Sequence, residues 1–250
     1  MATFAFIHGA ADVGWYWHLV EAELRDRGHH TVAPNLPCED DAAGLTEYAD
    51  TVLGAIGDRA DPVVVVGQSF GGFTAPLVAE RRPVAGLVLV AAMIPAPGES
   101  PVSWWSSSGY PSASGGDGAD GGGGAEGDEG GGGAEGGGGA PDGGDGDAYQ
   151  AFYHDVPREL ADEAMRRSRG QSEARMGEPW PLSRWPDVPT RFVLGTEDRS
   201  FPPAFLRRLA AERLGIVPDE LRAGHCMALS RPRELAALLH RYATEFTAAG

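Results

Sequence analysis

The stretch VVVVGQSFGG, residues 63–72, decides the fold. Four consecutive valines predict a buried strand, because β-branched side chains pack well on a pleated surface. The strand leads into Ser69, which stands in the pattern Gly-x-Ser-x-Gly, and a helical sequence follows. A strand, a tight turn and a helix form the context in which this pattern presents a reactive serine hydroxyl. We therefore predict that Ser69 is a nucleophile; the alternative is a turn residue without chemistry.

Short apolar runs bounded by Gly or Pro recur along the chain and predict buried parallel strands. They cover residues 4–7, 30–33, 63–66, 87–91 and 192–194. Helical patterns cover residues 15–27, 45–56, 71–82, 203–214 and 232–246. This alternation favours the α/β class with a mostly parallel, doubly wound sheet. Ser230 is expected to cap the last helix. Pro76 lies inside the third helix, where a proline costs about 3 kcal/mol or more, so a kink or a later start is expected.

Residues 96–185 interrupt the alternation and are interpreted as a cap inserted into an α/β core formed by residues 1–95 and 186–250. Within the cap, residues 115–147 comprise 19 glycines, nine acids, four alanines and one proline. Such a composition cannot offset the backbone ordering cost of about 1–2 kcal/mol per residue, so disorder is predicted at about 112–148. A flexible solvated insertion is favoured over a calcium-binding or partner-binding acidic segment.

The charge balance and the cysteine content indicate which partners and which cellular compartment to expect. The chain has 36 acids and 20 bases, and 27 acids remain outside the Gly-acid segment. This balance indicates no nucleic-acid face. Only Cys38 and Cys226 are present, so a disulfide framework is not expected. The chain begins without a basic signal-peptide region, and no apolar run approaches the ~20 residues that span a bilayer. We expect a soluble cytoplasmic protein, monomeric or homodimeric, without a membrane partner.

A serine hydroxyl is a poor nucleophile at neutral pH and needs a base. His225 follows the last predicted strand and precedes the last helix, so a loop can return its imidazole to the carboxyl edge of the sheet. Asp198 directly follows the strand at 192–194 and is the preferred carboxylate to orient His225. The order Ser69, Asp198, His225 is the one this strand–turn–helix arrangement uses. Glu197 stays open as an alternative acid.

The other histidines receive different interpretations. His154 lies in the predicted cap and is a candidate for substrate contact. His8 follows the first strand and is expected to bond loop carbonyls. The remaining four, His18, His29, His30 and His240, are expected to be surface or packing residues.

An oxyanion that develops on the substrate needs two backbone N–H donors. The residue after the nucleophile, Phe70, supplies one, and Ala10 in the loop after the first strand supplies the other. Trp104 and Trp105 are candidates for an apolar acyl-binding pocket together with Phe70. Packing of the cap against the core is the equally weighted alternative for these aromatic residues. No metal and no cofactor are expected.

With these residues in place, the chain resembles the α/β-hydrolase superfamily, in particular its small members related to plant methyl esterases and hydroxynitrile lyases. The motifs that carry the resemblance are HGA at residues 8–10, GQSFGG at 67–72, GTEDRSFPP at 195–203 and GHCMALSRPRELAALL at 224–239. The resemblance covers both flanks, roughly residues 1–95 and 186–250, and is poor across the cap. Similar proteins tend to have an Asp and a Pro-Gly turn where this chain has PNLPCEDD, at 34–41. The shape of the pocket entrance is therefore expected to differ from theirs.

The resemblance implies a serine hydrolase that cleaves a small carboxylic ester, a lactone or a thioester through an acyl-enzyme on Ser69. Hydroxynitrile lyases of this group resemble a pattern with a threonine after the first-strand histidine and a lysine just after the catalytic histidine. This chain has Gly9 and Cys226 at those positions, so that lyase activity is disfavoured. Serine at position 69 disfavours the dehalogenases and epoxide hydrolases, which use aspartate there. Two alternatives stay open: a small-molecule binding or signalling protein on the same fold, and a lyase or tailoring enzyme of secondary metabolism.

Overall fold

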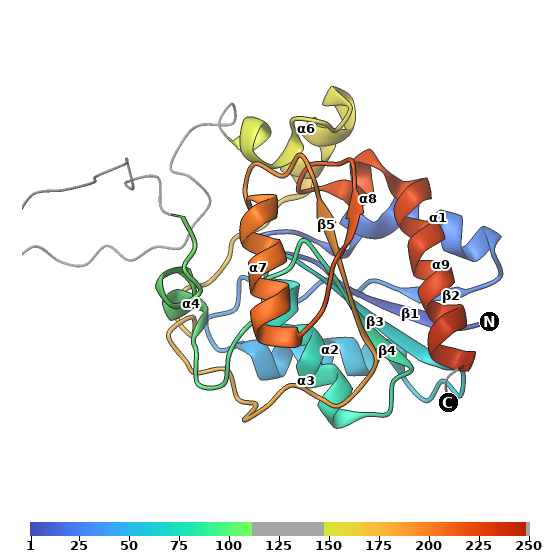
Figure 1. The fold of residues 1–250 in the computed structure, drawn as a ribbon, viewed down its shortest axis with the longest axis horizontal. Helices are drawn as coiled ribbons and strands as arrows, with labels where there is room; N and C mark the ends of the chain where they lie inside the picture. Colours follow the sequence, from blue (N-terminus) through green and yellow to red (C-terminus); the bar gives the residue numbers. More distant parts are fainter. Residues whose placement is uncertain (112–147, 249–250) are drawn as a thin grey trace, which may run out of the picture.

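The computed structural model describes residues 1–111 and 148–248. Its centre is an all-parallel sheet with the strand order β2-β1-β3-β4-β5-β6 (Figure 1). The strands are β1 (Thr3–Ile7), β2 (His30–Val32), β3 (Val63–Gln68), β4 (Gly86–Val90), β5 (Thr190–Gly195) and β6 (Asp219–Leu221). Because β2 and β3 lie on opposite sides of β1, the loops after β1 and β3 diverge, and such switch points are where open α/β sheets bind ligands. The predicted α/β class and parallel sheet are confirmed.

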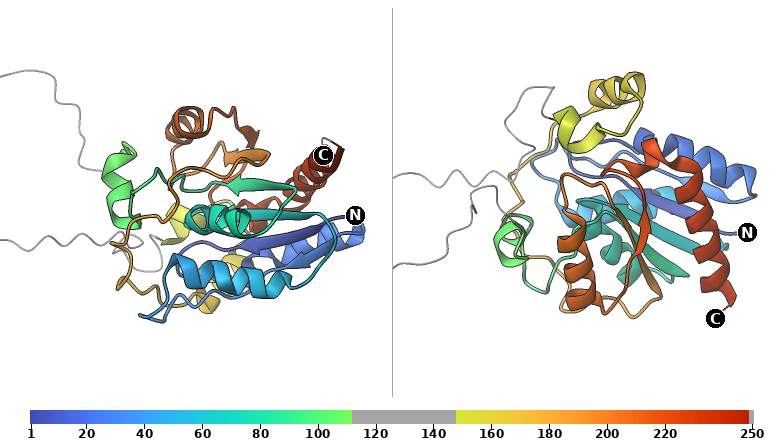
Figure 2. Two further views of the ribbon diagram at one scale, coloured as in Figure 1. Left: turned by 90° about the horizontal axis from the view of Figure 1, so that it is seen from below. Right: turned by 45° about the horizontal axis from the view of Figure 1, so that its top comes forward.

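Helices cover both faces of the sheet, as Figures 1 and 2 show. One face packs against α2 (Leu45–Ile56), α3 (Gly71–Arg81) and α7 (Pro203–Leu214). The other face packs against η1 (Gly14–Trp17), α1 (His18–Asp26), α8 (Met227–Ser230) and α9 (Pro232–Ala248). The valines of β3 alternate between the two cores, with Val65 in the first and Val66 in the second. Both faces are thus buried, which explains why the strand sequences are continuously apolar rather than alternating.

Three local predictions differ from the structure. The predicted helix at 15–27 divides into the 3-10 turn η1 and the helix α1. The helix α3 begins at Gly71 and runs through Pro76, so it does not start later. The expected cap by Ser230 is wrong, because Ser230 is the last residue of α8 and its Oγ atom has no hydrogen-bond partner among the described residues.

Between β4 and β5, the described residues contain three helical segments that were not predicted. They are α4 (Pro101–Ser107), the π-helical turn η2 (Tyr149–Tyr153) and α6 (Arg158–Arg167). Figure 1 shows α6 above the end of the sheet and α4 beside α7. The predicted Gly-acid segment at about 112–148 lies outside the described residues except for Ala148, and the predicted cap boundaries stay a prediction.

A largely buried ion pair joins Glu99, two residues before α4, to Arg213 of α7. The guanidinium of Arg213 donates to both carboxylate oxygens of Glu99, over 2.6 and 2.9 Å. Glu99 is 7% exposed, and its carboxylate also accepts the Ala96 N–H. Burial alone would raise the pKa of Glu99, but the hydrogen bonds from Arg213 and Ser107 hold it below its ordinary value. The base of α4 is therefore held by a bidentate, charge-assisted contact.

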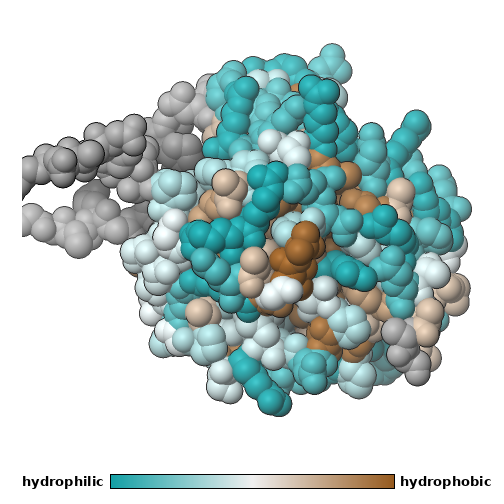
Figure 3. All heavy atoms as spheres, in the orientation of Figure 1, coloured by the Kyte–Doolittle hydropathy of each residue, from teal (hydrophilic) through white to brown (hydrophobic). Residues whose placement is uncertain are grey.

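The surface in the orientation of Figure 1 is mostly hydrophilic, with a small hydrophobic area near its middle (Figure 3). Val217, in the turn between α7 and β6, is 90% exposed. Among the described residues, no helix combines the length and the apolar composition that crossing a bilayer requires.

Candidate active site

Ser69 occupies a strained turn between β3 and α3. Its φ angle of 50° lies in the left-handed region, which a residue with a side chain rarely adopts. The neighbouring glycines allow the close approach that this turn needs. A Cβ atom on Gly67 would lie 2.7 Å from the Gly71 carbonyl oxygen, and a Cβ atom on Gly71 would lie 2.9 Å from the Ile7 carbonyl oxygen. The sharp turn leaves Ser69 only partly buried at the carboxyl edge of the sheet.

The loop after β1 lies directly against this turn. A Cβ atom on Gly9 would lie 3.2 Å from the Cβ atom of Ser69. His8 shapes the loop: its Nε2 accepts the Leu36 N–H over 3.1 Å, and its Nδ1–H donates to the Gly9 carbonyl over 2.8 Å. Burial lowers the pKa of His8 to about 4, so the imidazole is neutral at pH 7. The expected structural role of His8 is confirmed.

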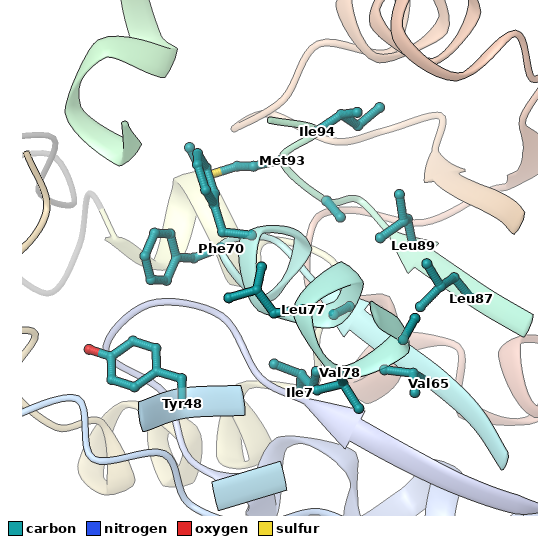
Figure 4. Packing of buried hydrophobic residues seen from close by; sticks show 14 of the residues in the cluster. Ile7, Tyr48, Val65, Phe70, Leu77, Val78, Leu87, Leu89, Met93 and Ile94 are labelled. Atoms are coloured by element: carbon teal, nitrogen blue, oxygen red, sulfur yellow. The ribbon is translucent and has the colours of Figure 1, made fainter. Parts of the chain in front are cut away.

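Of the two predicted oxyanion donors, Phe70 directly follows Ser69, and Ala10 lies in the loop after β1. Within residues 1–111 and 148–248, neither the Ala10 N–H nor the Phe70 N–H donates to a protein acceptor. Phe70 is buried, and buried backbone N–H groups are nearly always paired, so its free N–H can serve a bound molecule. Ala10 is exposed, so its N–H is open to solvent or to a bound molecule. Phe70 is 7% exposed and belongs to the buried cluster that Figure 4 shows, where its ring lies 5.6 Å from that of Phe73.

The structure places His225 against Asp198. The Nδ1–H of His225 donates to Asp198 Oδ2 over 2.8 Å, and the two side chains are 3% and 0% exposed. The other oxygen, Oδ1, accepts the N–H groups of Ser200 and Phe201 over 2.8 and 2.9 Å. Both carboxylate oxygens of Asp198 are therefore committed to fixed donors.

Glu197, the alternative acid, points elsewhere. Its carboxylate accepts from Nε of Arg222 over 2.7 Å, and the Arg222 side chain is 87% exposed. An exposed pair of this kind contributes little to stability. Of the two neighbouring acids, only Asp198 contacts the histidine.

Aromatic rings enclose the imidazole of His225. Phe201, from the loop after β5, lies edge-on at 5.1 Å between ring centroids, and Phe152 of η2 lies edge-on at 5.5 Å. With Nδ1 bonded to Asp198, Nε2 is the remaining ring nitrogen, and it has no hydrogen-bond partner in the part of the chain that the structure describes. In the same part of the chain, no hydrogen bond joins Ser69 Oγ to His225. Sequence reasoning assigned a role to neither phenylalanine, although Phe201 lies within the motif at 195–203; Phe152 adjoins no motif.

A second carboxyl group, Asp12, lies in the loop after β1 and near His225. The residue is partly exposed, but its carboxyl group is buried, and Oδ1 accepts the Val13 N–H over 2.8 Å. Burial raises the pKa of Asp12 to about 7, although the Val13 N–H and the charge of His225 oppose the rise. Asp12 stands two residues after Ala10, and this position was its only signal in the sequence.

Asp12→Asn is expected to stabilise the protein in a pH-dependent way. The unfolded chain loses the Asp12 proton near pH 3.8, whereas the folded protein keeps it to about pH 7, so stability falls as the pH rises between these values. The amide should therefore raise the free energy of unfolding by about 1–4 kcal/mol at pH 8 and change it little at pH 3.5. Urea unfolding at both values measures this. Asp58→Asn, at an exposed position, is the control, and an equal gain at both pH values would contradict the prediction.

The predicted pocket tryptophans occupy different environments. Trp104 is fully buried, and its indole N–H donates to the Ile94 carbonyl over 3.1 Å. This is core packing, which was the alternative prediction for Trp104. Trp105 packs against Trp104 at 5.2 Å and is partly exposed. Its role in substrate binding stays a prediction.

No group of three or more His, Cys, Asp or Glu side chains within the described ranges is arranged to hold a metal ion. Cys38 and Cys226 are both buried and free. A surface hollow of about 290 Å³ lies between the end of α7 and the segment before β5, and none of the predicted site residues lines it. The assignment of Ser69, His225, Asp198 and the N–H groups of Ala10 and Phe70 as the reacting groups stays a prediction.

Comparisons with known proteins agree with the fold. The sequence matches the alpha/beta hydrolase family over residues 4–238. The rice protein Probable esterase PIR7A (Oryza sativa subsp. indica) is 36% identical over 107 residues, which cover 38% of this chain and 41% of the rice protein. The carbendazim hydrolyzing esterase of Nocardioides sp. is 33% identical over 110 residues, covering 40% of this chain and 46% of that protein.

The match thus spans less than half the length of these relatives. The crystal structure of polyneuridine aldehyde esterase superposes with a TM-score of 0.75 at 20% identity, covering 96% of this chain and 98% of that one. At this identity the superposition supports the fold alone.

Proposed function

Because the chain belongs to the alpha/beta hydrolase family, we propose that it hydrolyses small carboxylic esters with Ser69 as nucleophile, His225 as base and Asp198 as the orienting acid. One observation carries the proposal: the buried 2.8 Å bond from His225 Nδ1 to Asp198 Oδ2, on loops at the same sheet edge as the strained Ser69. This bond fixes the tautomer in which Nε2 is the proton acceptor. The names of the rice and Nocardioides relatives, both esterases, support the reaction class.

The proposed reaction proceeds in two halves. His225 Nε2 takes the hydroxyl proton of Ser69 as Oγ attacks the ester carbonyl, and Asp198 stabilises the imidazolium that forms. The N–H groups of Ala10 and Phe70 donate to the oxyanion of the tetrahedral intermediate. When this intermediate collapses, His225 protonates the leaving alkoxide and Ser69 keeps the acyl group. Water, activated by the same imidazole, then releases the carboxylic acid and restores Ser69.

The surroundings of the site favour uncharged substrates. The rings of Phe70, Phe152 and Phe201 give the site apolar walls. The carboxyl group of Asp12 becomes anionic above about pH 7 and then disfavours a second negative charge nearby. A neutral ester with a small apolar acyl group fits these properties better than a dicarboxylate or a phosphate ester.

A fluorophosphonate probe tests the proposal through the intact mass of the protein. The expected result is one adduct on the wild-type chain, none on Ser69→Ala, and greatly slowed labelling of His225→Ala, because the probe reacts only with an activated hydroxyl. Ser106→Ala, which removes an exposed serine of α4, is the matched control and should label normally. A folded wild-type protein without an adduct, or an adduct that persists in Ser69→Ala, would reject Ser69 as the nucleophile and favour the binding-protein alternative.

A further inference from the structure

Asp155, at the turn between η2 and α6, reaches across to the loop that carries His225. Its Oδ2 atom accepts the N–H of Gly224 over 2.8 Å, and Gly224 directly precedes His225. The contact is close: a Cβ atom on Gly224 would lie 2.6 Å from Asp155 Oδ1 and 2.8 Å from His154 Nε2. The position next to the imidazole must therefore be glycine for the two surfaces to meet.

His154, the residue before Asp155, bonds the loop that carries Asp198. Nε2–H of His154 donates to the carbonyl of Glu197 over 2.9 Å, and Glu197 directly precedes Asp198. His154 and Asp155 therefore bond the main chain of the residues that directly precede Asp198 and His225. The predicted contact of His154 with the substrate stays a prediction, and the structure shows its Nε2 bonded to the main chain.

The carboxylate of Asp155 is poorly compensated for a buried group. Its side chain is 7% exposed, and the Arg231 guanidinium lies 4.0 Å from Oδ2. Oδ1 is buried and has no hydrogen-bond partner among the described residues. A buried carboxylate in such surroundings costs stability. A buried carboxylate that bonds the main chain next to the proposed base is explained by positioning.

We infer that Asp155 is a positioning residue, which holds the Gly224–His225 main chain so that the imidazole keeps its bond to Asp198, with His154 doing the same from the side of Glu197. The inference rests on the proposed function for its effect on catalysis. Because both residues lie between η2 and α6, the contact also makes the alignment of the site depend on the docking of this segment. Asp155 and His154 then contribute to turnover without touching the substrate.

Asp155→Ala tests the inference, with two readouts measured well below the unfolding temperature. Loss of the acceptor should lower kcat on a short-chain ester by about 10- to 100-fold with little change in KM, because misplacing a catalytic group slows the chemical step. It should also broaden or shift the downfield proton NMR signal of the His225 Nδ1–H···Asp198 bond. Asp155→Asn keeps one oxygen for the Gly224 N–H and should restore both values to within about threefold.

Asp162→Ala is the matched control, since it removes an exposed carboxylate of α6 whose one partner among the described residues is Arg158. It should leave kcat and the NMR signal unchanged. If Asp155→Ala does not fold, Asp155→Ser replaces it, because the shorter side chain cannot reach Gly224. A folded variant with wild-type kcat and an unchanged signal, or an Asn variant as impaired as the Ala variant, would overturn the inference. The NMR signal needs no substrate, so it reports on Asp155 even if Ser69 proves not to be the nucleophile.

Discussion

Ester turnover is expected to fall by about 10,000- to 1,000,000-fold in Ser69→Ala and in His225→Ala, and the double variant is expected to be no slower than either. Alanine at position 69 removes the atom that would hold the acyl group. Alanine at position 225 leaves a hydroxyl whose proton no base can accept. Because Ser69 and His225 act in the same step, losing either one removes the acceleration of that step. Losing the other as well therefore lowers the rate little further.

Initial rates on a short-chain ester, with folding checked by circular dichroism, measure this result. His30→Ala is the matched control, because His30 is an exposed histidine whose nearest acid, Asp61, lies 3.8 Å away. It should keep full activity. Multiplying losses in the double variant would show that the two residues act independently, and near-normal rates in Ser69→Ala would place the nucleophile elsewhere.

The sheet and the turn at Ser69 were predictable because local sequence and tertiary position agree there. Strand β3 is apolar on both faces and buried on both, so the four valines gave a clear signal. Close backbone contacts require glycine at positions 67 and 71. These two glycines form the Gly-x-Ser-x-Gly pattern from which the turn was predicted. The predicted strand ends were displaced by one or two residues, which is the usual uncertainty of terminal hydrogen bonding.

The weaker elements lacked such agreement. Strand β6 has the sequence Asp-Glu-Leu and lies at the edge of the sheet, partly exposed, so it shows no apolar run. Helix α6 buries only Ala161 and Ala164, and its remaining residues are mainly charged. A narrow stripe of two alanines gives little periodic signal, although Pro157 before the helix marks its start.

The contacts around the proposed base could not be predicted from the sequence at all. Asp155 and Gly224 are 69 positions apart, and no motif links them. The burial of the Asp12 carboxyl group likewise depends on how the loop after β1 folds over the site. By contrast, the contact of Asp198 with His225 was expected from the order of Ser69, Asp198 and His225 along the chain.

Asp198→Asn is expected to lower kcat by about 1,000- to 10,000-fold, and the structure gives a specific reason. The N–H groups of Ser200 and Phe201 both point at Oδ1, so the single oxygen of asparagine must take that position. The amide NH2 then replaces Oδ2 and points at Nδ1 of His225. An NH2 donor there favours the tautomer with the proton on Nε2, which cannot accept the proton of Ser69. The side chain keeps its shape while the imidazole loses its function as a base.

Steady-state kinetics of Asp198→Asn beside Glu197→Gln separate the two acids. Glu197 bonds an exposed arginine, so its amide should change kcat by less than about threefold. KM should stay close to the wild-type value in both variants, because neither carboxylate is proposed to contact the substrate. If Glu197→Gln lost activity while Asp198→Asn kept it, the orienting acid would be the other residue. If neither variant lost activity, His225 would not depend on a carboxylate, and the proposed mechanism would fail at that step.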